Sequence, residues 1–500
     1  MLSALLLIPL LGALALVLWP GERSPERLQR TAAALLMLQL LWSVRVLLQF
    51  DPLDGGMQMV ESVVWIERLG LLYRLGVDGL SLPLLLINAL LCLVAVVCTG
   101  PIQNRPRLYY ALLLLISGAV NGAFLAQNLL LFFLFYELEL IPLWLLIAIW
   151  GGERRAYAAT KFLLFTAVSG GLILAAFLGL ALTTGSVDFG VHPQLAALLS
   201  PGTQRLLMLA LLLGFAIKIP LVPFHTWLPD AHTEASTPVS VLLAGVLLKL
   251  GTYGLLRFCL GLFPEAWSDL GPVLAGWAAV SVLFGSLAAI VQTDMKRMVA
   301  YSSVGHMGTV MLAAAAATPV SLSGSLFQML SHGLISALLF LLVGVVYRVT
   351  GSRDLTVLRG LLNPQRGLPL TGSLMVIGVM ASMGIPGMSG FISEFLIFRG
   401  SLARFPIPTL VCMVGCGLTA VYFLLLVNRA FFGRLTPELV SPTRTLPVVA
   451  LSSQVPALVL TSAIVILGLL PQPLARLIEA SSQAQSQLPR MLQQASGGLL

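Results

Sequence analysis

The sequence predicts an all-α polytopic membrane protein with about 14 transmembrane helices. Of its 500 residues, 58% are hydrophobic and only 10% are charged, and the mean hydropathy is +0.97. So few charges could not cover the surface of a soluble domain. Apolar runs long enough to cross a bilayer recur along the whole chain, and the arginines gather in alternate loops between them.

The apolar runs measure about 18 to 25 residues, the length that a helix needs to span the hydrocarbon core. The first run has no basic residues before it, so it is predicted to be a spanning helix rather than a signal peptide. The predicted spans are 2–19, 31–50, 78–99, 108–126, 128–150, 158–183, 204–224, 236–262, 270–291, 296–317, 320–347, 368–402, 405–431 and 446–470.

Basic residues mark one side of the membrane. Sixteen of them follow odd-numbered spans, which predicts that those loops lie in the cytoplasm or stroma and that both termini lie on the lumenal or periplasmic side. This topology also explains the net charge of +8 without a nucleic-acid partner. The sixteen are Arg23, Arg27, Arg30, Arg105, Arg107, Arg154, Arg155, Lys296, Arg297, Arg348, Arg353, Arg359, Arg366, Arg429, Arg434 and Arg444. The six in the opposite loops are Arg68, Arg74, Arg205, Arg257, Arg399 and Arg404.

Proline interrupts two of the apolar runs in a similar way. The segment AIKIPLVPFHTW carries Pro220 and Pro223, and SMGIPGMSGFIS carries Pro386. Because proline removes an amide donor and clashes with the preceding turn, both segments are predicted to be broken helices. Each break has a charged residue nearby, Lys218 in the first and Glu394 in the second. The odd number of spans between the breaks predicts an inverted internal repeat with ion sites at the breaks.

The chain holds only four lysines beside 24 arginines. Lys218 and Lys249 lie inside apolar runs, and Lys161 lies near the start of another, whereas Lys296 is interpreted as a marker of topology. An intramembrane ammonium is costly and therefore indicates function. Lysine gives up its proton readily on burial, whereas arginine stays charged. The placement of lysine thus favours proton transfer.

The depth of each group separates the central candidates from the helpers. Lys249 lies about 13 residues into its run, which is about 20 Å along a helix and therefore mid-membrane. Glu137, in FFLFYELELIP, is surrounded by aromatic and aliphatic residues. Glu139 lies two residues further on, points to a different helix face and is a candidate helper. Lys161 can reach the membrane surface from its position and is a second helper.

Histidines complete the candidate set. His306 and His332 occupy adjacent spans, where imidazole can pass a proton between its two nitrogens or form a hydrogen bond between helices. His225 and His232, in HTWLPDAHTEAS, are candidate helpers that organise the end of the broken helix. Zinc is an alternative for them, but no HExxH or CxxC spacing supports it, so no metal is predicted.

No cofactor motif occurs in the chain. There is no GxGxxG after a strand, no GxxxxGK[ST], no CxxC and no nucleophile elbow, so no cofactor is predicted in this chain. The five cysteines fall in or beside apolar runs and are predicted to be small buried hydrophobes. What remains has the composition of a proton relay, and its predicted catalytic members are Glu137, Lys218, Lys249, His306, His332 and Glu394.

The chain resembles the antiporter-like subunits of complex I, the NuoM type of bacteria and the NdhD (chain 4) type of cyanobacteria and plastids. The strings that carry the resemblance are FFLFYELELIPLWLLIAIWGGERRAYAATKF, FHTWLPDAHTEASTPVSVLLAGVLLKLGTYGLLR, AYSSVGHMG and IPGMSGFISEF. Related subunits and Mrp-type cation/proton antiporters share HTWLPDAH but usually carry lysine where this chain has Glu394. The strings ELELIP and YAATKF favour the cyanobacterial and plastid type.

The resemblance implies a fold of about 14 helices with two inverted five-helix repeats and a proton channel. Carried over to this chain, it pairs Glu137 with Lys218, makes Lys249 the central relay group, and makes Glu394 the terminal group on the exit side. His306 and His332 match family histidines that bridge the two halves. The implied domains are 1–107 (N-terminal helices), 108–262 (first repeat), 263–434 (second repeat) and 435–500 (last helix and tail).

The implied function is that of a proton-translocating membrane-arm subunit of a redox-driven NAD(P)H or ferredoxin:plastoquinone (quinone) oxidoreductase. NAD(P)H or ferredoxin, iron–sulfur clusters and quinone are expected in partner subunits. The expected partners are the other membrane-arm subunits, including related antiporter-like ones, and the lipid bilayer. The expected location is the cyanobacterial thylakoid membrane, with a bacterial inner membrane as the alternative. Two other functions stay open, namely an Mrp-type sodium/proton antiporter subunit and a structural element whose buried charges only specify packing.

Overall fold

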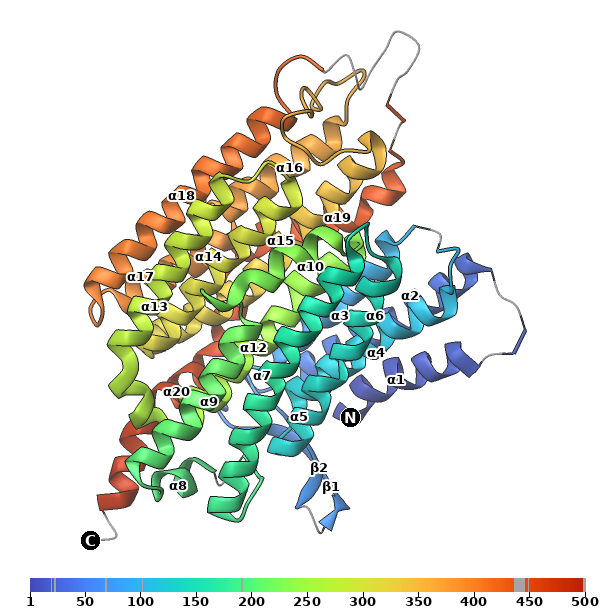
Figure 1. Cartoon of the computed structure of the whole chain (residues 1–500). Helices are drawn as coiled ribbons and strands as arrows, with labels where there is room; N and C mark the ends of the chain where they lie inside the picture. Colours follow the sequence, from blue (N-terminus) through green and yellow to red (C-terminus); the bar gives the residue numbers. More distant parts are fainter. Residues whose placement is uncertain are drawn as a thin grey trace.

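The computed structural model describes residues 1–18, 20–21, 24–67, 70–100, 102–189, 192–435, 446–447 and 449–497. Over these residues the chain forms a bundle of long helices that lie side by side (Figure 1). The N-terminal helices and the orange C-terminal helices lie on opposite sides of the green middle segment. Three arginines used for the predicted sidedness, Arg23, Arg68 and Arg444, lie outside the described residues.

Among the residues that the structure describes, ten helices are long and apolar enough to cross a membrane. Three shorter apolar helices accompany them, namely α1 (Leu2–Leu18), α3 (Leu82–Cys98) and α16 (Pro369–Ser382). The prediction of a helical, multi-pass membrane protein is therefore confirmed.

A two-stranded antiparallel hairpin departs from the all-α prediction. Strands β1 (Gln58–Ile66) and β2 (Leu71–Val77) follow α2 (Pro25–Gln49) and pair Val63 with Tyr73. The stretch VESVVWI in β1 is rich in β-branched and aromatic residues, which favour a strand. Figure 1 shows the hairpin projecting from the end of the bundle near the N-terminus.

The first half of the bundle is built around one broken helix and one irregular helix. Its elements are α4 (Pro106–Leu125), α5 (Leu129–Leu138), α6 (Leu140–Trp150), α7 (Arg155–Thr184), α8 (His192–Ala197), α9 (Pro201–Lys218), η2 (Phe224–Thr226), α10 (Trp227–Glu234), α11 (Thr237–Leu242), η3 (Leu243–Leu247), α12 (Leu248–Gly254) and η4 (Leu255–Leu260). The break between α9 and α10 falls where Pro220 and Pro223 predict it. The π-helical segments η3 and η4 flank α12 within one continuous span, Thr237–Leu260.

The second half repeats the break. Its elements are α13 (Pro264–Ile290), α14 (Met295–Ala316), α15 (Pro319–Thr350), α16, α17 (Ser389–Ser401), α18 (Pro406–Ala430), α19 (Leu451–Leu469) and α20 (Gln472–Gly497). The chain leaves helical geometry between α16 and α17, where Gly384 and Gly387 have φ of +69° and +90°. This is the second break that the prolines and glycines predict.

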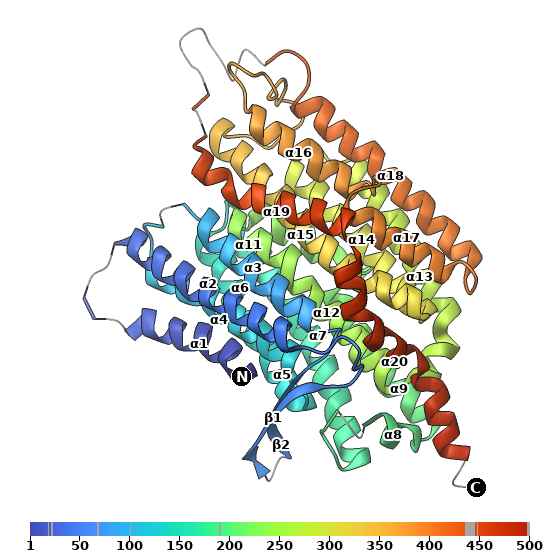
Figure 2. The same ribbon diagram turned by 180° about the vertical axis from the view of Figure 1, so that it is seen from behind.

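The last helix was not predicted, because the sequence after the final apolar run reads as a tail. Figure 2 shows α20 leaving the end of α19 and running along the outside of the bundle toward α9. It fits closely against the chain there, because a Cβ on Gly79 would lie 2.3 Å from the carbonyl oxygen of Leu477. Its Gln485 amide also donates to the carbonyl oxygen of Leu256 at 2.5 Å.

Glycines allow α15 and α17 to touch backbone to backbone. A Cβ on Gly324 would lie 2.6 Å from the backbone nitrogen of Ile397, and one on Gly400 would lie 2.3 Å from that of Ser321. Small residues at such contacts are the usual way in which membrane helices pack closely, since lipid provides no hydrophobic drive for association.

We predict that Gly400→Val separates α15 from α17 and destabilises the protein by about 1–3 kcal/mol, because the added methyl groups overlap fixed backbone atoms. The thermal stability and yield of the purified protein would measure the effect. Gly276→Val is the control, since a Cβ there meets no atom of another helix within 4 Å. Equal stability of the two variants would contradict the packing argument.

Candidate functional site: a buried row of ionisable side chains

A buried ion pair joins α9 to the helix formed by α5 and α6. Lys218 Nζ lies 2.5 Å from Glu139 Oε1, and the side chains are 2% and 0% exposed. The same ammonium lies 3.8 Å from the centroid of the Tyr136 ring, a cation–π contact. Lys218 is also the last residue of α9, where the helix dipole favours a cation.

This geometry corrects the predicted pairing of Glu137 with Lys218. Pro142 has no amide proton to donate to the carbonyl oxygen of Leu138, and the helix is interrupted at Glu139, between α5 and α6. Glu139 faces the bundle interior, whereas Glu137 is partly exposed and forms no ion pair within the described residues. Glu139, expected only as a helper, is thus the direct partner of Lys218.

Glu137 instead faces α7. Its carboxylate occupies the space beside Gly170, where a Cβ would lie 2.4 Å from Glu137 Oε1. Glycine at position 170 therefore makes room for this acidic side chain. The two glutamates lie on different faces of one helix, as their spacing predicts, and only one of them reaches the lysine.

Lys249 lies deep in the bundle and is 1% exposed. Its Nζ donates to the carbonyl oxygen of Ala244 at 2.7 Å and lies 2.8 Å from His332 Nδ1 on α15. Ala244 belongs to the π-helical segment η3, and π-bulges of this kind occur frequently at functional sites. On the side toward α9, Gly251 packs against Lys218, where a Cβ would lie 3.3 Å from Lys218 Cβ.

The row continues from α15 to α14 and α17. The rings of His332 and His306 have centroids 5.6 Å apart, and His306 Nδ1 lies 3.7 Å from Glu394 Oε1. His306 Nε2 also lies 3.1 Å from the Ser382 hydroxyl. The structure thus brings together the predicted residues His306, His332 and Glu394.

A small cavity lies between these three side chains. Its volume is about 10 Å³, close to the space that a single water molecule needs, and six of its nine lining residues carry polar side chains. Gln328 and Ser331 line it as well. A water molecule here would connect, through hydrogen bonds, side chains that lie too far apart to bond one another directly.

The broken helix between α16 and α17 holds Glu394 in place. A Cβ on Gly384 would lie 2.7 Å from Glu394 Oε2, and Gly384 has a positive φ. Only glycine satisfies both conditions, because other residues rarely adopt that conformation and have no room for the carboxylate.

Two of the remaining predicted helpers, Lys161 and His225, lie apart from this row. Lys161 pairs with Asp230 at 2.7 Å, near the start of α7. His225 packs edge to face on Phe284, with ring centroids 4.8 Å apart. In the described part of the chain, no three His, Cys, Asp or Glu residues gather as metal ligands would.

Lys296 is the functional candidate that sequence reasoning missed. It was interpreted as a topology marker in a loop, but it lies in the first turn of α14 and is only 3% exposed. Its Nζ donates to the carbonyl oxygen of Ala235 at 2.6 Å and lies 3.4 Å from the Ser240 hydroxyl. The ion pair between Arg353 and Asp294 lies at the same end of α14.

His232 lies close to this lysine. The Ser240 hydroxyl that contacts Lys296 also donates to the carbonyl oxygen of His232 at 3.3 Å. The His232 ring is 0% exposed, stacks on Phe340 at 4.3 Å, and has no hydrogen-bond partner for either nitrogen among the described residues. A count of loop charges cannot find such a site, whereas the neighbouring Asp294, a typical helix N-cap residue, indicates that Lys296 already lies in the helix.

Known proteins are similar to this chain in sequence and in fold. The family described as NADH:quinone oxidoreductase/Mrp antiporter, TM, matches residues 126–419. NAD(P)H-quinone oxidoreductase chain 4 1 of Synechococcus sp. (strain JA-3-3Ab) is 43% identical over 452 residues, which cover 88% of this chain and 84% of the relative.

Two solved structures have the same architecture. A chain of respiratory complex I from Thermus thermophilus with bound NADH is 28% identical, with a TM-score of 0.87 and coverage of 98% of this chain and 99% of that one. A chain of the Mrp complex from Dietzia sp. DQ12-45-1b is 24% identical, with a TM-score of 0.85 and coverage of 97% of both chains, which shows a common fold.

The chain therefore belongs to the NADH:quinone oxidoreductase/Mrp antiporter family of membrane proteins. Within that family it is a complex I-like NAD(P)H-quinone oxidoreductase subunit of the chain 4 type.

The Lys218–Glu139 pair makes a prediction about stability. We expect Glu139→Gln to destabilise the protein by about 3–5 kcal/mol, because it leaves the buried ammonium of Lys218 without its counter-ion. Adding Lys218→Met should restore much of the loss, since the double variant buries no unpaired charge. Thermal unfolding of the purified protein would measure both.

Glu137→Gln is the matched control on the same helix and is expected to cost less, because Glu137 forms no ion pair in the described structure. A larger loss for Glu137→Gln than for Glu139→Gln would show that Glu137 is the partner of Lys218.

Proposed function

We propose that this chain translocates protons across the membrane as part of a redox-driven NAD(P)H or ferredoxin:quinone oxidoreductase. The observation that carries the proposal is the buried row Lys249, His332, His306 and Glu394, whose neighbours lie 2.8 to 5.6 Å apart. Intramembrane groups of this kind commonly form proton relays. The redox cofactors belong to partner subunits, and this chain supplies the membrane path.

The proposed membrane arrangement has fourteen spans in two inverted five-helix repeats, with boundaries at 108–262 and 263–434. It is supported by a helical segment at each predicted apolar run and by the two broken helices. We place the arginine-rich loops in the cytoplasm and both termini in the lumen or periplasm. A cyanobacterial thylakoid membrane fits the Synechococcus relative.

The Lys218–Glu139 pair is the proposed switch. Opposite charges stabilise the charged forms of both groups, whereas desolvation without a partner favours neutral forms. Opening the pair therefore drives a proton off Lys218 toward Lys249, and closing it draws a proton back. Moving one charge against the membrane potential costs about 2.3 kcal/mol per 100 mV, which a change in a buried ion pair can supply.

Lys296 and His232 form the proposed loading branch. Lys296 lies near the ion pair between Asp294, which caps α14, and Arg353, in the loop after α15. His232 is joined to Lys296 through the Ser240 hydroxyl. Protons from the arginine-rich side would pass along this branch to Lys249 and continue through His332 and His306 to Glu394.

A second candidate function is sodium/proton antiport, because the fold is that of a chain in the Mrp complex. A sodium-dependent collapse of a pH gradient in vesicles that contain the purified complex would identify an antiporter. A gradient that forms only on electron transfer, with or without sodium, would identify a pump.

We predict that Lys249→Ala abolishes proton translocation while the complex still assembles, because the variant removes the central group of the relay. Proton uptake per electron in vesicles, with the subunit composition as a check of assembly, would measure this. Arg205→Ala is the control, since Arg205 pairs with Asp269 at the exposed surface. A normal proton yield in assembled Lys249→Ala complex would refute the proposal.

Lys296→Arg tests the loading branch separately. Arginine keeps the positive charge but does not release its proton at physiological pH, so proton yield should fall although topology is preserved. If Lys296 only marked topology, its replacement by arginine would leave the proton yield unchanged. Arg297→Lys, one residue further along α14, is the matched control.

A further inference from the structure

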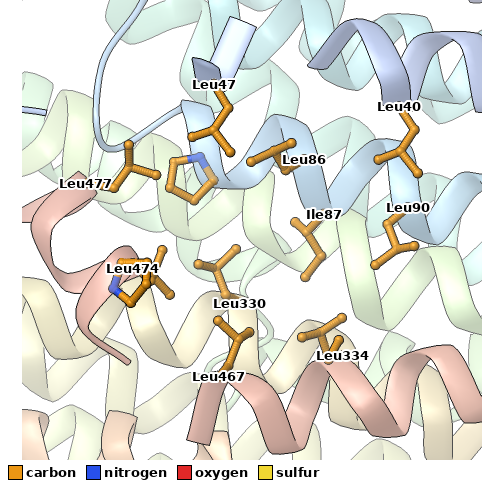
Figure 3. Close-up of a pocket in the computed structure, with 13 residues that line it drawn as sticks. Leu40, Leu47, Leu86, Ile87, Leu90, Leu330, Leu334, Leu467, Leu474 and Leu477 are labelled. Atoms are coloured by element: carbon orange, nitrogen blue, oxygen red, sulfur yellow. The ribbon is translucent and has the colours of Figure 1, made fainter. Parts of the chain in front are cut away.

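An apolar cavity of about 360 Å³ opens between the N-terminal helices and the second half of the bundle. Thirteen described residues line it, and none of them carries a polar or charged side chain. Figure 3 shows leucines from several helices pointing into this space. The lining residues are Leu40, Leu47, Pro83, Leu86, Ile87, Leu90, Leu330, Leu334, Ala463, Leu467, Pro473, Leu474 and Leu477.

The cavity is elongated along the helices. Leu40 and Leu47 lie seven residues apart on α2, and Pro83 and Leu90 lie seven apart on α3, so each of these walls is about 10 Å long. Helices α15 and α19 form the opposite side, and residues in the first turns of α20 line one end. The shape suits a hydrocarbon chain lying parallel to the helices.

The walls exclude water as the occupant. A water molecule needs two to four polar partners, and an unfilled apolar cavity forfeits dispersion contacts for every side chain around it. In a bilayer, the molecules available to fill such a space are lipids, through their acyl chains. The adjoining outer face of α2 is itself suited to lipid, since Leu41 and Leu48 are 60% and 80% exposed.

The end of the cavity that α20 lines offers a contact for a lipid headgroup. Helix α20 begins directly after the apolar helix α19, and its Arg476 is exposed and stands beside the lining residue Leu477. Arg476 has no ion-pair partner in the described structure, and the nearby Glu479 carboxylate already accepts a hydrogen bond from Gln483. An exposed arginine at the membrane surface attracts anionic lipid.

We propose that this cavity binds one acyl chain of an anionic membrane glycerolipid, whose phosphate lies at Arg476. The lipid is a bound component of the subunit rather than part of the surrounding bilayer.

The site lies against the proposed relay. The lining residue Ile87 packs on Gly333, where a Cβ would lie 2.7 Å from Ile87 Cδ1 and 3.4 Å from Lys249 Cε. Gly333 follows His332 and precedes the lining residue Leu334. The bound chain therefore supports α15 at the position where His332 meets Lys249. This functional consequence rests on the proposed function, whereas the binding site itself does not.

The binding site is tested with a phosphatidylglycerol that carries a photoactivatable group on one acyl chain, added to the purified complex in vesicles. We expect labelling of this chain at residues of α2, α3, α15 or α19 that line the cavity. Ala463→Phe fills the cavity and should abolish that labelling, whereas Val459→Phe, on the exposed side of α19, should leave it unchanged. Thermal stability shows that both variants fold, and Leu467→Trp replaces Ala463→Phe if that variant does not.

The headgroup contact is tested in the same assay. Arg476→Gln should lower labelling by phosphatidylglycerol about fivefold and leave labelling by an equivalent phosphatidylcholine unchanged. Equal labelling of Ala463→Phe and wild type would overturn the proposal. Labelling of the cavity by a prenylquinone probe in place of the lipid would also overturn it. A cross-link from the cavity residues to another subunit would do the same.

The effect of the bound lipid on the relay is tested by a separate measurement, the proton yield per electron. Removing lipid with detergent should lower proton yield per electron, and phosphatidylglycerol should restore it in wild type, whereas Ala463→Phe should pump without added lipid. Labelling in the Lys249→Ala variant separates the proposed lipid site from the proposed proton relay. If that variant pumps normally and its cavity is still labelled, the relay is wrong and the lipid site stands.

Discussion

A buried ammonium group in a membrane must find its polar partners inside the protein, and this requirement shapes the centre of the bundle. Lys218, Lys249 and Lys296 are all almost inaccessible. Each is solvated differently, by a carboxylate, by a carbonyl oxygen and an imidazole, and by a carbonyl oxygen and a hydroxyl. Regular helices offer no free carbonyl groups, so burial of these lysines requires helices that are broken, capped or π-helical near them.

The irregular backbone segments coincide with the ionisable side chains. Glu139 lies where α5 gives way to α6, and Ala244, which accepts from Lys249, lies in η3. Ala235, which accepts from Lys296, is the residue that ends α10, and Glu394 faces the turn at Gly384. Proline and glycine cost helix stability at each break, and the polar contacts formed there offset part of that cost. The distortions of the backbone therefore occur where the buried ionisable side chains need hydrogen-bond partners.

The sequence was sufficient for the helical class, the two broken helices and the burial of Lys249, because hydropathy and proline act locally. It could not choose between Glu137 and Glu139. A spacing of two residues places them on different faces, but which face meets Lys218 depends on how the helix is rotated and interrupted before Pro142. The burial of Lys296 was missed for a related reason. A count of loop charges treats every basic residue alike, although Lys296 is enclosed while the next residue, Arg297, is only partly buried.

The helix α15 runs without interruption from Pro319 to Thr350 and carries His332 near its middle. Its His332 lies 2.8 Å from the Lys249 ammonium, and the helix packs against α16, α17, α19 and α20 elsewhere along its length. A rigid helix moves as a unit, so a push at either end displaces His332 along Lys249. Proton transfer requires atoms within hydrogen-bond reach, and a slide of about 1 Å is enough to interrupt it. In the relay proposed above, displacement of α15 at its exposed end near Tyr347 would therefore interrupt proton transfer between Lys249 and His332 without any change at the charged groups themselves.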